Sequence, residues 1–259
     1  MIKFLNRAFG GAVILTLLIL ITYLGRIPLA LGVAAFSYIA LHEMDKALSK
    51  IKLHLPMKCL YFTNGIIMLA AFINNSDIYI ASIVVSVLYL FMYIILTGHY
   101  SLYDGFAAAF VMLYVSFLIS HILRIKDVSY VWMLYITAWG SDTFAYLVGS
   151  LFGRHKMEWM AHISPNKTIE GSIGGIVGAT ILNIVYCHEF GLDTYVREIV
   201  IFTIIAAIMS QIGDLIASYI KRQTGIKDFG NLIPGHGGIL DRFDSIMFIA
   251  PVLYLFSRI

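Results

Sequence analysis

Residues Ile78 to Tyr103 read IYIASIVVSVLYLFMYIILTGHYSLY. This stretch contains no Asp, Glu, Lys or Arg, and it is longer than the roughly 20 apolar residues that a helix needs to cross a bilayer. Four further stretches are also free of these charges: residues 8–25, 59–76, 105–123 and 171–188. The sequence therefore predicts an all-α protein that crosses a membrane several times.

The composition of the chain supports this prediction. Of its 259 residues, 60% are hydrophobic and 13% are charged, whereas about a quarter of the residues of a soluble domain are charged. The first apolar stretch follows Lys3 and Arg7 as in a signal peptide, but its length and the lack of a cleavage site predict a retained helix. The apolar pattern predicts nine transmembrane helices, near residues 8–25, 27–47, 58–75, 78–97, 103–123, 128–152, 169–188, 196–221 and 240–257.

We expect a single membrane domain, 1–259, in which residues 1–130 form N-terminal helices and residues 139–259 carry the catalytic site. Lys and Arg favour cytoplasmic loops, and a cytoplasmic N-terminus places thirteen of the eighteen on that side. These thirteen are Lys3, Arg7, Lys46, Lys50, Lys52, Lys58, Arg154, Lys156, Lys167, Lys221, Arg222, Lys227 and Arg242. The two long connections, residues 153–168 and 221–239, then face the cytoplasm together with most of the acids, Glu43 among them.

The segment from Gln211 to Ser245, QIGDLIASYIKRQTGIKDFGNLIPGHGGILDRFDS, holds many of the unusual polar residues. Asp214, Ser218 and Lys221 are spaced i, i+4 and i+7, so they share one face of the eighth predicted helix. Asp214 lies roughly 10 Å from the cytoplasmic end of that helix. An ionised carboxylate at that depth is costly unless it is paired, hydrated or bound to a metal, so Asp214 is a functional candidate.

Two further acids, Asp241 and Asp244, open the ninth predicted helix. Carboxylates at a helix N-terminus are stabilised by the helix dipole, which is a purely structural explanation for the pair. The alternative is that Asp214, Asp241 and Asp244 bind divalent cations that bridge to phosphates, because magnesium takes one or two carboxylates plus substrate oxygens. The basic residues Lys221, Arg222, Lys227 and Arg242 favour this second explanation. The expected chemistry is phosphoryl or nucleotidyl transfer.

Glycines surround His236 in the connection between these helices, in the order Pro234, Gly235, His236, Gly237, Gly238. Glycines let backbone amides approach an anion closely, but a Gly-Gly pair before a helix is equally consistent with a plain loop. His236 is a candidate contact for a phosphate or a base, although an isolated histidine is more often structural.

The other long connection ends in SPNKTIEG, residues 164–171. Thr168 is either the cap of the next helix or a nucleotide contact, and Asn166 and Lys167 are candidate substrate contacts. Asp142 in the sixth predicted helix either makes a structural hydrogen bond or lines a polar cavity. The glycines at 171, 174, 175 and 178 form overlapping GxxxG pairs, which indicate close helix packing.

The residues from Ser218 to Asp244 resemble the signature of the phosphatidate cytidylyltransferase (CDP-diacylglycerol synthase) family. The fixed positions of that signature that this chain matches are Ser218, Ile220, Lys221, Arg222, Lys227, Asp228, Gly230, Ile233, Pro234, His236, Gly237, Gly238, Ile239, Asp241, Arg242, Phe243 and Asp244. Two other recurrent features of the family are similar, the stretch from Trp139 to Tyr146 and the SPNKTIEG loop. The resemblance covers residues 139–245, and the first 130 residues are similar only as apolar helices.

This resemblance implies a magnesium-dependent reaction of CTP with phosphatidic acid that yields CDP-diacylglycerol and pyrophosphate at the cytoplasmic membrane. It also implies a homodimer, and metal ligation by Asp214 and Asp241 with Asp244 close by. A second metal ion or a monovalent ion beside the magnesium stays open. Two alternatives from the residues also stay open: a CTP-dependent lipid kinase, which would attack the γ-phosphorus, and a transporter, against which the one-sided placement of charges argues.

Overall fold

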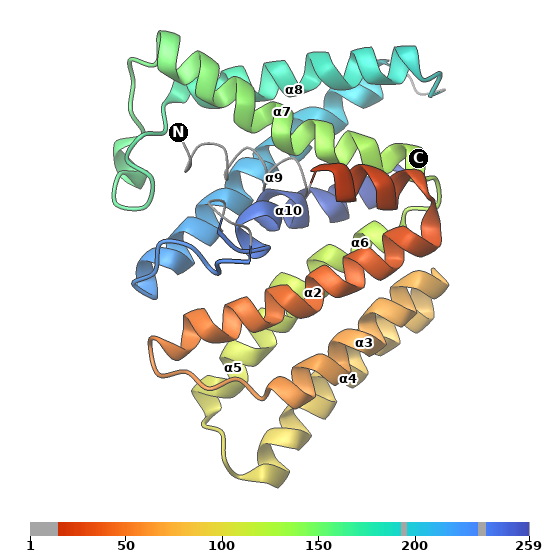
Figure 1. Cartoon of the computed structure of the whole chain (residues 1–259), viewed down its shortest axis with the longest axis vertical. Helices are drawn as coiled ribbons and strands as arrows, with labels where there is room; N and C mark the ends of the chain where they lie inside the picture. Colours follow the sequence, from red (N-terminus) through yellow and green to blue (C-terminus); the bar gives the residue numbers. More distant parts are fainter. Residues whose placement is uncertain (1–14, 193–195, 233–236, 259) are drawn as a thin grey trace. The chain divides into compact units, whose positions relative to one another are not determined.

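The protein is seen here as a computed structural model, which describes residues 15–192, 196–232 and 237–258 (Figure 1). These residues form helices joined by short connections and contain no β-strand, and an isolated bridge joins Lys156 and Thr168. The prediction of an all-α protein is confirmed. The long helices are α2 (Arg26–Ser49), α3 (Met57–Ile73), α4 (Ser76–Thr97), α7 (Val128–Phe152), α8 (Ile169–Glu189), α9 (Val196–Gln223) and α10 (Leu240–Phe256).

The fifth predicted helix, near residues 103–123, is continuous but not uniform. It consists of α5 (Leu102–Val111), a π-helical segment η1 (Met112–Phe117) and α6 (Leu118–Arg124). Part of the first predicted helix is also described, as helical residues 15–23. A short 3₁₀ helix, η2 (Glu158–Met160), lies in the first long connection.

Five of the described helices are long and apolar enough to cross a membrane. They are Arg26–Ser49, Ser76–Thr97, Leu102–Arg124, Ile169–Glu189 and Val196–Gln223. The shorter apolar helix Met57–Ile73 falls below that length. Several membrane-spanning helices are thus supported, while the full count of nine and the cytoplasmic N-terminus remain predictions.

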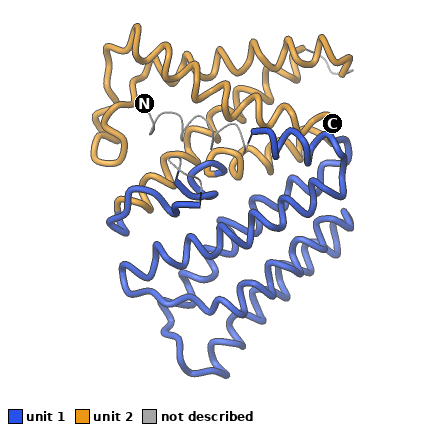
Figure 2. Tube along the Cα trace, viewed as in Figure 1, with its two compact units in different colours: residues 1–128, 223–243 blue, residues 129–222, 244–259 orange. Residues whose placement is uncertain are grey.

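The chain divides into two compact units (Figure 2). Unit 1 contains residues 1–128 and 223–243, and unit 2 contains residues 129–222 and 244–259. The first boundary lies close to the predicted end of the N-terminal helices at residue 130. The second divides the signature segment, since residues 223–243 fold with the N-terminal helices. The single domain predicted for residues 1–259 remains an expectation.

Unit 1 is built around α3, which packs against α2, α4 and α6. Buried polar pairs connect these helices inside the apolar core. The Asn64 amide donates to the Ser37 hydroxyl at 2.9 Å, and the hydroxyls of Tyr79 and Ser120 lie 2.7 Å apart. Such pairs are expected between helices that have no water around them, because buried polar groups need partners.

Local sequence sets where the helices of unit 1 begin. Asn75 precedes α4, and its side chain accepts hydrogen bonds from the Asp77 and Ile78 amides. Ser101 and Asp104 form a capping box at the start of α5. The buried Asp104 carboxylate also accepts the His54 amide at 2.7 Å, so it ties the connection before α3 to the start of α5.

Unit 2 depends on a close contact between α7 and α8. A Cβ atom at Gly171 or Gly175 would collide with backbone oxygens of α7, and one at Gly178 would collide with the ring of Phe144. The GxxxG pattern was predicted to mark close helix packing, and the structure confirms this within the chain itself. The contact is extended by Asn183, whose amide donates to the Thr137 hydroxyl at 2.8 Å.

Candidate functional site

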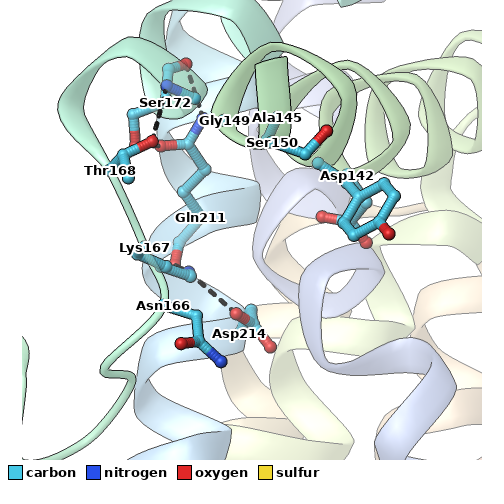
Figure 3. Close-up of a pocket in the computed structure, with 12 residues that line it drawn as sticks. Asp142, Ala145, Gly149, Ser150, Asn166, Lys167, Thr168, Ser172, Gln211 and Asp214 are labelled. Atoms are coloured by element: carbon cyan, nitrogen blue, oxygen red, sulfur yellow. Dashed lines mark hydrogen bonds and ion pairs between the residues drawn. The ribbon is translucent and has the colours of Figure 1, made fainter. Parts of the chain in front are cut away.

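A cavity of about 510 Å³ in unit 2 gathers many of the polar residues that the sequence singled out (Figure 3). Its wall is formed by α7, α8, α9 and the connection that precedes α8. The lining residues are Asp142, Ala145, Tyr146, Gly149, Ser150, Asn166, Lys167, Thr168, Gly171, Ser172, Gln211 and Asp214. The structure therefore brings together five predicted site residues from three separate segments: Asp142, Asn166, Lys167, Thr168 and Asp214.

An ion pair between Lys167 and Asp214 lies in this cavity, with 2.8 Å between Nζ and Oδ2 (Figure 3). The side chains are 25% and 37% exposed, respectively. Lys167 Nζ also donates to the Gln211 carbonyl at 3.5 Å. The neighbouring ammonium thus offsets the free-energy cost of placing a carboxylate deep in α9. Both groups line the cavity, so either can also interact with a ligand.

Thr168 occupies the N-cap position of α8, and its hydroxyl accepts the Gly171 amide at 3.1 Å. The structural explanation for Thr168 is therefore confirmed, while its place on the cavity wall leaves the predicted nucleotide contact untested. Capping and the Lys156 bridge hold the end of the SPNKTIEG connection in place. The first turn of α8, at the positive end of its helix dipole, consequently borders the cavity.

Asp142, Tyr146 and Gly149 line the same cavity from α7. Their spacing of i, i+4 and i+7 places these three on one face of the helix. Asp142 therefore lines a polar cavity, as one of its two interpretations expected, and a structural hydrogen bond of Asp142 stays open. Tyr146 is largely exposed. Gly149 lies where a Cβ would approach the Thr168 hydroxyl at 3.1 Å, so α7 and the start of α8 are close at this point.

Gln211 is a cavity residue that the sequence reasoning missed. Its side-chain oxygen accepts the Ser172 hydroxyl at 2.7 Å, and its Nε2 donates to the Ser172 carbonyl at 3.0 Å. Gln211 therefore fixes α9 to the first turn of α8. The available signal was an uncharged polar residue within an apolar helix, one turn before Asp214 and on the same face.

Asp244, the third predicted metal ligand, lies in unit 2 near the start of α10. It is 8% exposed, and its Oδ1 accepts the Ser245 amide at 2.7 Å. A Cβ at Gly213 would meet the Asp244 carbonyl oxygen at 2.6 Å, so α9 and α10 approach closely beside Asp214. Ser218, Lys221 and Arg222 follow on α9 and do not line the cavity.

Asp241 belongs to unit 1, where it organises the start of α10. Its Oδ2 accepts the amides of Phe229 at 2.8 Å and Gly238 at 2.9 Å. Gly237 has φ +84°, a conformation that side chains disfavour, and a Cβ there would meet Asp241 Oδ2. The two described glycines of the predicted anion cradle, Gly237 and Gly238, thus wrap around a carboxylate of the chain itself.

The remaining predicted residues of unit 1 are exposed. Lys227 and Arg242 lie on the surface, and Asp228 lines a second cavity of about 460 Å³ between α2 and residues 226–232. His236 lies outside the described residues. Asp214 and Asp241 fall in different units, and the predicted joint metal site of Asp214, Asp241 and Asp244 therefore remains a prediction.

The donor atoms of the unit 2 cavity fit a hard cation. Magnesium is held by one or two carboxylates together with substrate oxygens and water, and Asp142 and Asp214 both line this cavity. Among the residues that the structure describes, no three His, Cys, Asp or Glu side chains form a metal site by themselves. A cation here would need phosphate oxygens or water to complete its coordination.

The sequence also matches a known protein family. The model of the cytidylyltransferase family matches residues 5–259. The chain belongs to this family. The match includes the first 130 residues, which in the sequence resembled the family only as apolar helices.

Individual relatives carry a common name. The phosphatidate cytidylyltransferase of Staphylococcus haemolyticus is 39% identical over 181 residues, which is 69% of each chain. That of Staphylococcus saprophyticus is 36% identical, again with 69% of each chain aligned. The enzyme of Staphylococcus aureus is 43% identical over 141 residues, or 54% of this chain and 53% of its own.

Proposed function

We propose that this chain is a phosphatidate cytidylyltransferase, a nucleotidyltransferase that converts CTP and phosphatidic acid to CDP-diacylglycerol and pyrophosphate in phospholipid biosynthesis. One structural observation supports the proposal above the others. The cavity of unit 2 joins the SPNKTIEG connection to Asp142 and Asp214, so two motifs of the family that lie apart in the sequence form one polar site.

The reaction requires an oxygen of the lipid phosphate to attack the α-phosphorus of CTP. The bond between that phosphorus and the bridging oxygen to the β-phosphate then breaks, and pyrophosphate leaves. A phosphate monoester has a second pKa near 6, so the nucleophile is already largely a dianion at neutral pH and needs little help from a base. The barrier is the approach of one anion to another, and the protein must neutralise and align them.

Residues of the unit 2 cavity are suited to that task. The Lys167 ammonium faces the cavity and is held beside Asp214, so it can place a positive charge against a phosphate. The first turn of α8 presents the positive end of a helix dipole to the same space. Asn166 and Thr168 supply neutral hydrogen-bonding groups for orienting a substrate.

We assign magnesium as the cofactor, with Asp214, Asp241 and Asp244 as its expected ligands and a second metal ion as an open alternative. When bound, the cation would neutralise phosphate charge. Lys221, Lys227, Arg222 and Arg242 are proposed to bind phosphate oxygens, and Ser218, Asp228, His236, Gly237 and Gly238 to complete the substrate site. These assignments rest on the signature resemblance and on the charge of the side chains.

We further propose that the protein lies in the cytoplasmic membrane with its site facing the cytoplasm. The support is the distribution of Lys and Arg, which favours the side of the two long connections. The family resemblance supports a homodimer.

Detergent-purified protein given phosphatidic acid and CTP labelled at the α-phosphate tests the reaction. We expect the label to enter the lipid only with magnesium, with release of one pyrophosphate per lipid. CTP labelled at the γ-phosphate is the control, because a lipid kinase would transfer that label instead. Label from the γ-position in lipid, or no transfer from either position, would contradict the proposal.

A further inference from the structure

Glu43 is an acid that neither the signature nor the proposed reaction uses. It lies in the C-terminal half of α2, far from the signature in sequence, and it is 4% exposed. A carboxylate buried inside a helix that is apolar enough to cross a membrane is costly, so its partners indicate what it does.

Both oxygens of Glu43 accept backbone amides from the end of the signature loop. Oε1 accepts the Ile239 amide at 2.9 Å, and Oε2 accepts the Leu240 amide at 2.8 Å. Leu240 is the first residue of α10, where the helix has no carbonyl of its own to pair with its amides. The side chain of Ile239 is apolar and cannot act as a cap, so Glu43 performs this role from another helix.

Two glycines of the loop make room for the Glu43 carboxylate. A Cβ atom at either Gly230 or Gly238 would collide with it. The carboxylate is therefore enclosed by both arms of the loop, one before and one after residues 233–236. Both glycines occupy fixed positions of the signature. Their contact with Glu43 explains why neither position has room for a side chain.

Asp241 also contacts both arms of the loop. Its Oδ2 accepts the Phe229 amide, next to Gly230, and the Gly238 amide. Two carboxylates thus hold the loop, Glu43 from α2 and Asp241 from α10. Because Glu43 fixes the first residues of α10, it also fixes where Asp241 is presented.

We infer that Glu43 is a positioning residue for the cytidylyl transfer, acting through Ile239 and Leu240 on the placement of Asp241 and without touching substrate. This inference rests on the proposed function. A buried carboxylate that only stabilises the fold is the alternative, and the experiment must separate the two.

Glu43→Gln is the informative variant, because the side chain keeps its size but offers one acceptor oxygen for two amides. We expect kcat to fall roughly 10- to 100-fold, the effect of a misplaced catalytic group, with KM for CTP within about threefold of the wild type. Asp104→Asn is the matched control. Asp104 is also a buried carboxylate of unit 1 that accepts two backbone amides, but it contacts the connection before α3 and the start of α5 instead.

The control should lose thermal stability at least as much as Glu43→Gln while its kcat stays near wild type. Equal losses of kcat in both variants, in step with their stability, would reduce Glu43 to a structural residue. A rise in KM with kcat unchanged would show a ligand contact and would also overturn the inference.

A double-mutant cycle with Gly230→Ala tests the contact directly. Alone, the new methyl group should displace the carboxylate and lower kcat. In a Glu43→Ala background, where the space is free, it should lower kcat no further. Losses that multiply would show that Gly230 and Glu43 act independently, and the inference would fail.

Hydrogen exchange of the peptide around Ile239 and Leu240 gives a measure that needs no turnover. We expect faster exchange there in Glu43→Gln and no change in Asp104→Asn. If the wild type showed no cytidylyl transfer, the proposed function would be wrong. Hydrogen exchange would still test whether Glu43 holds the amides of Ile239 and Leu240. Unchanged exchange in Glu43→Gln would overturn the anchoring itself.

Discussion

Asp214 of unit 2 is stabilised differently from Asp241 and Glu43 of unit 1. In unit 2, Asp214 is paired with the Lys167 ammonium and keeps 37% of its side chain exposed at a cavity. In unit 1, Asp241 and Glu43 are held by backbone amides, and Glu43 is almost completely buried. An ion pair at a cavity can exchange one partner for a ligand, whereas a carboxylate enclosed by amides fixes the backbone around it.

This difference indicates that these acids have different roles in the two units. The unit 2 cavity supplies side chains that can meet substrate, and the loop of unit 1 supplies a framework that holds its own acids in place. Asp241 is the best test of these different roles, because it is both an amide-bound carboxylate and a proposed metal ligand.

Asp241→Asn should have the largest effect. The Asn oxygen can still accept the amides of Phe229 and Gly238, so the protein should remain folded. The loss of charge should lower kcat by roughly 10³-fold, as expected for a group that contributes several kcal/mol to a phosphoryl transition state. Turnover of α-labelled CTP and the thermal midpoint measure the two effects.

Asp77→Asn is the control for that variant, since Asp77 is an exposed acid in the first turn of α4. It should keep near-normal turnover. Near-normal activity of Asp241→Asn at saturating magnesium would leave Asp241 with only its framework role and would break the assignment.

Lys167→Ala should have the next largest effect. It removes the cation from the cavity and leaves the Asp214 carboxylate without its ion-pair partner. We expect kcat/KM for CTP to fall by about 10²-fold, in the range of a lost charged hydrogen bond in a site. Lys167→Arg should restore part of the loss because it keeps the charge.

Lys156→Ala provides the comparison for that measurement. Lys156 is an exposed residue of the same connection, and its bridge to Thr168 uses the backbone alone. A loss in Lys156→Ala equal to that in Lys167→Ala would indicate a general electrostatic effect and not a specific role of the ion pair.

Gln211→Ala should have the smallest effect. The two hydrogen bonds to Ser172 are neutral and join α9 to α8 at the cavity wall. Their loss should change kcat/KM by roughly 2- to 10-fold, in line with about 0.5–1.5 kcal/mol for a net hydrogen bond. A loss as large as that of Lys167→Ala would show that neutral wall contacts matter as much as the ion pair.

The sequence predicted the helices well because apolar length and helical spacing are local properties. Helical spacing also explains why Asp142, Tyr146 and Gly149 share the cavity wall. Thr168 as a cap and the glycine contacts of α8 were also local signals. Asp142 and Asp214 were separate candidates in the sequence, and their meeting in one cavity depends on tertiary packing.

Other features depend on partners far away in the chain and left no local signal. The sequence placed Glu43 only among the acids on the cytoplasmic side, and nothing nearby in sequence indicated that Ile239 and Leu240 would bind it. The division of the signature between two units is likewise a property of tertiary packing. The same holds for the glycines of the loop: the sequence left a cradle for a ligand and a plain loop both open, and it did not predict their contacts with Glu43 and Asp241.

The separation of 196 residues between Glu43 and Ile239 has a consequence for biogenesis. Chains are synthesised at about 5–20 residues per second, so this carboxylate waits on the order of 10–40 s for its amides to be made. The N-terminal helices are completed during that interval, but the Glu43 carboxylate still has no loop amides to accept. Closure of unit 1 is therefore a late event of assembly, and nascent chains stalled before Ile239 should present Glu43 to any chaperone or protease within reach.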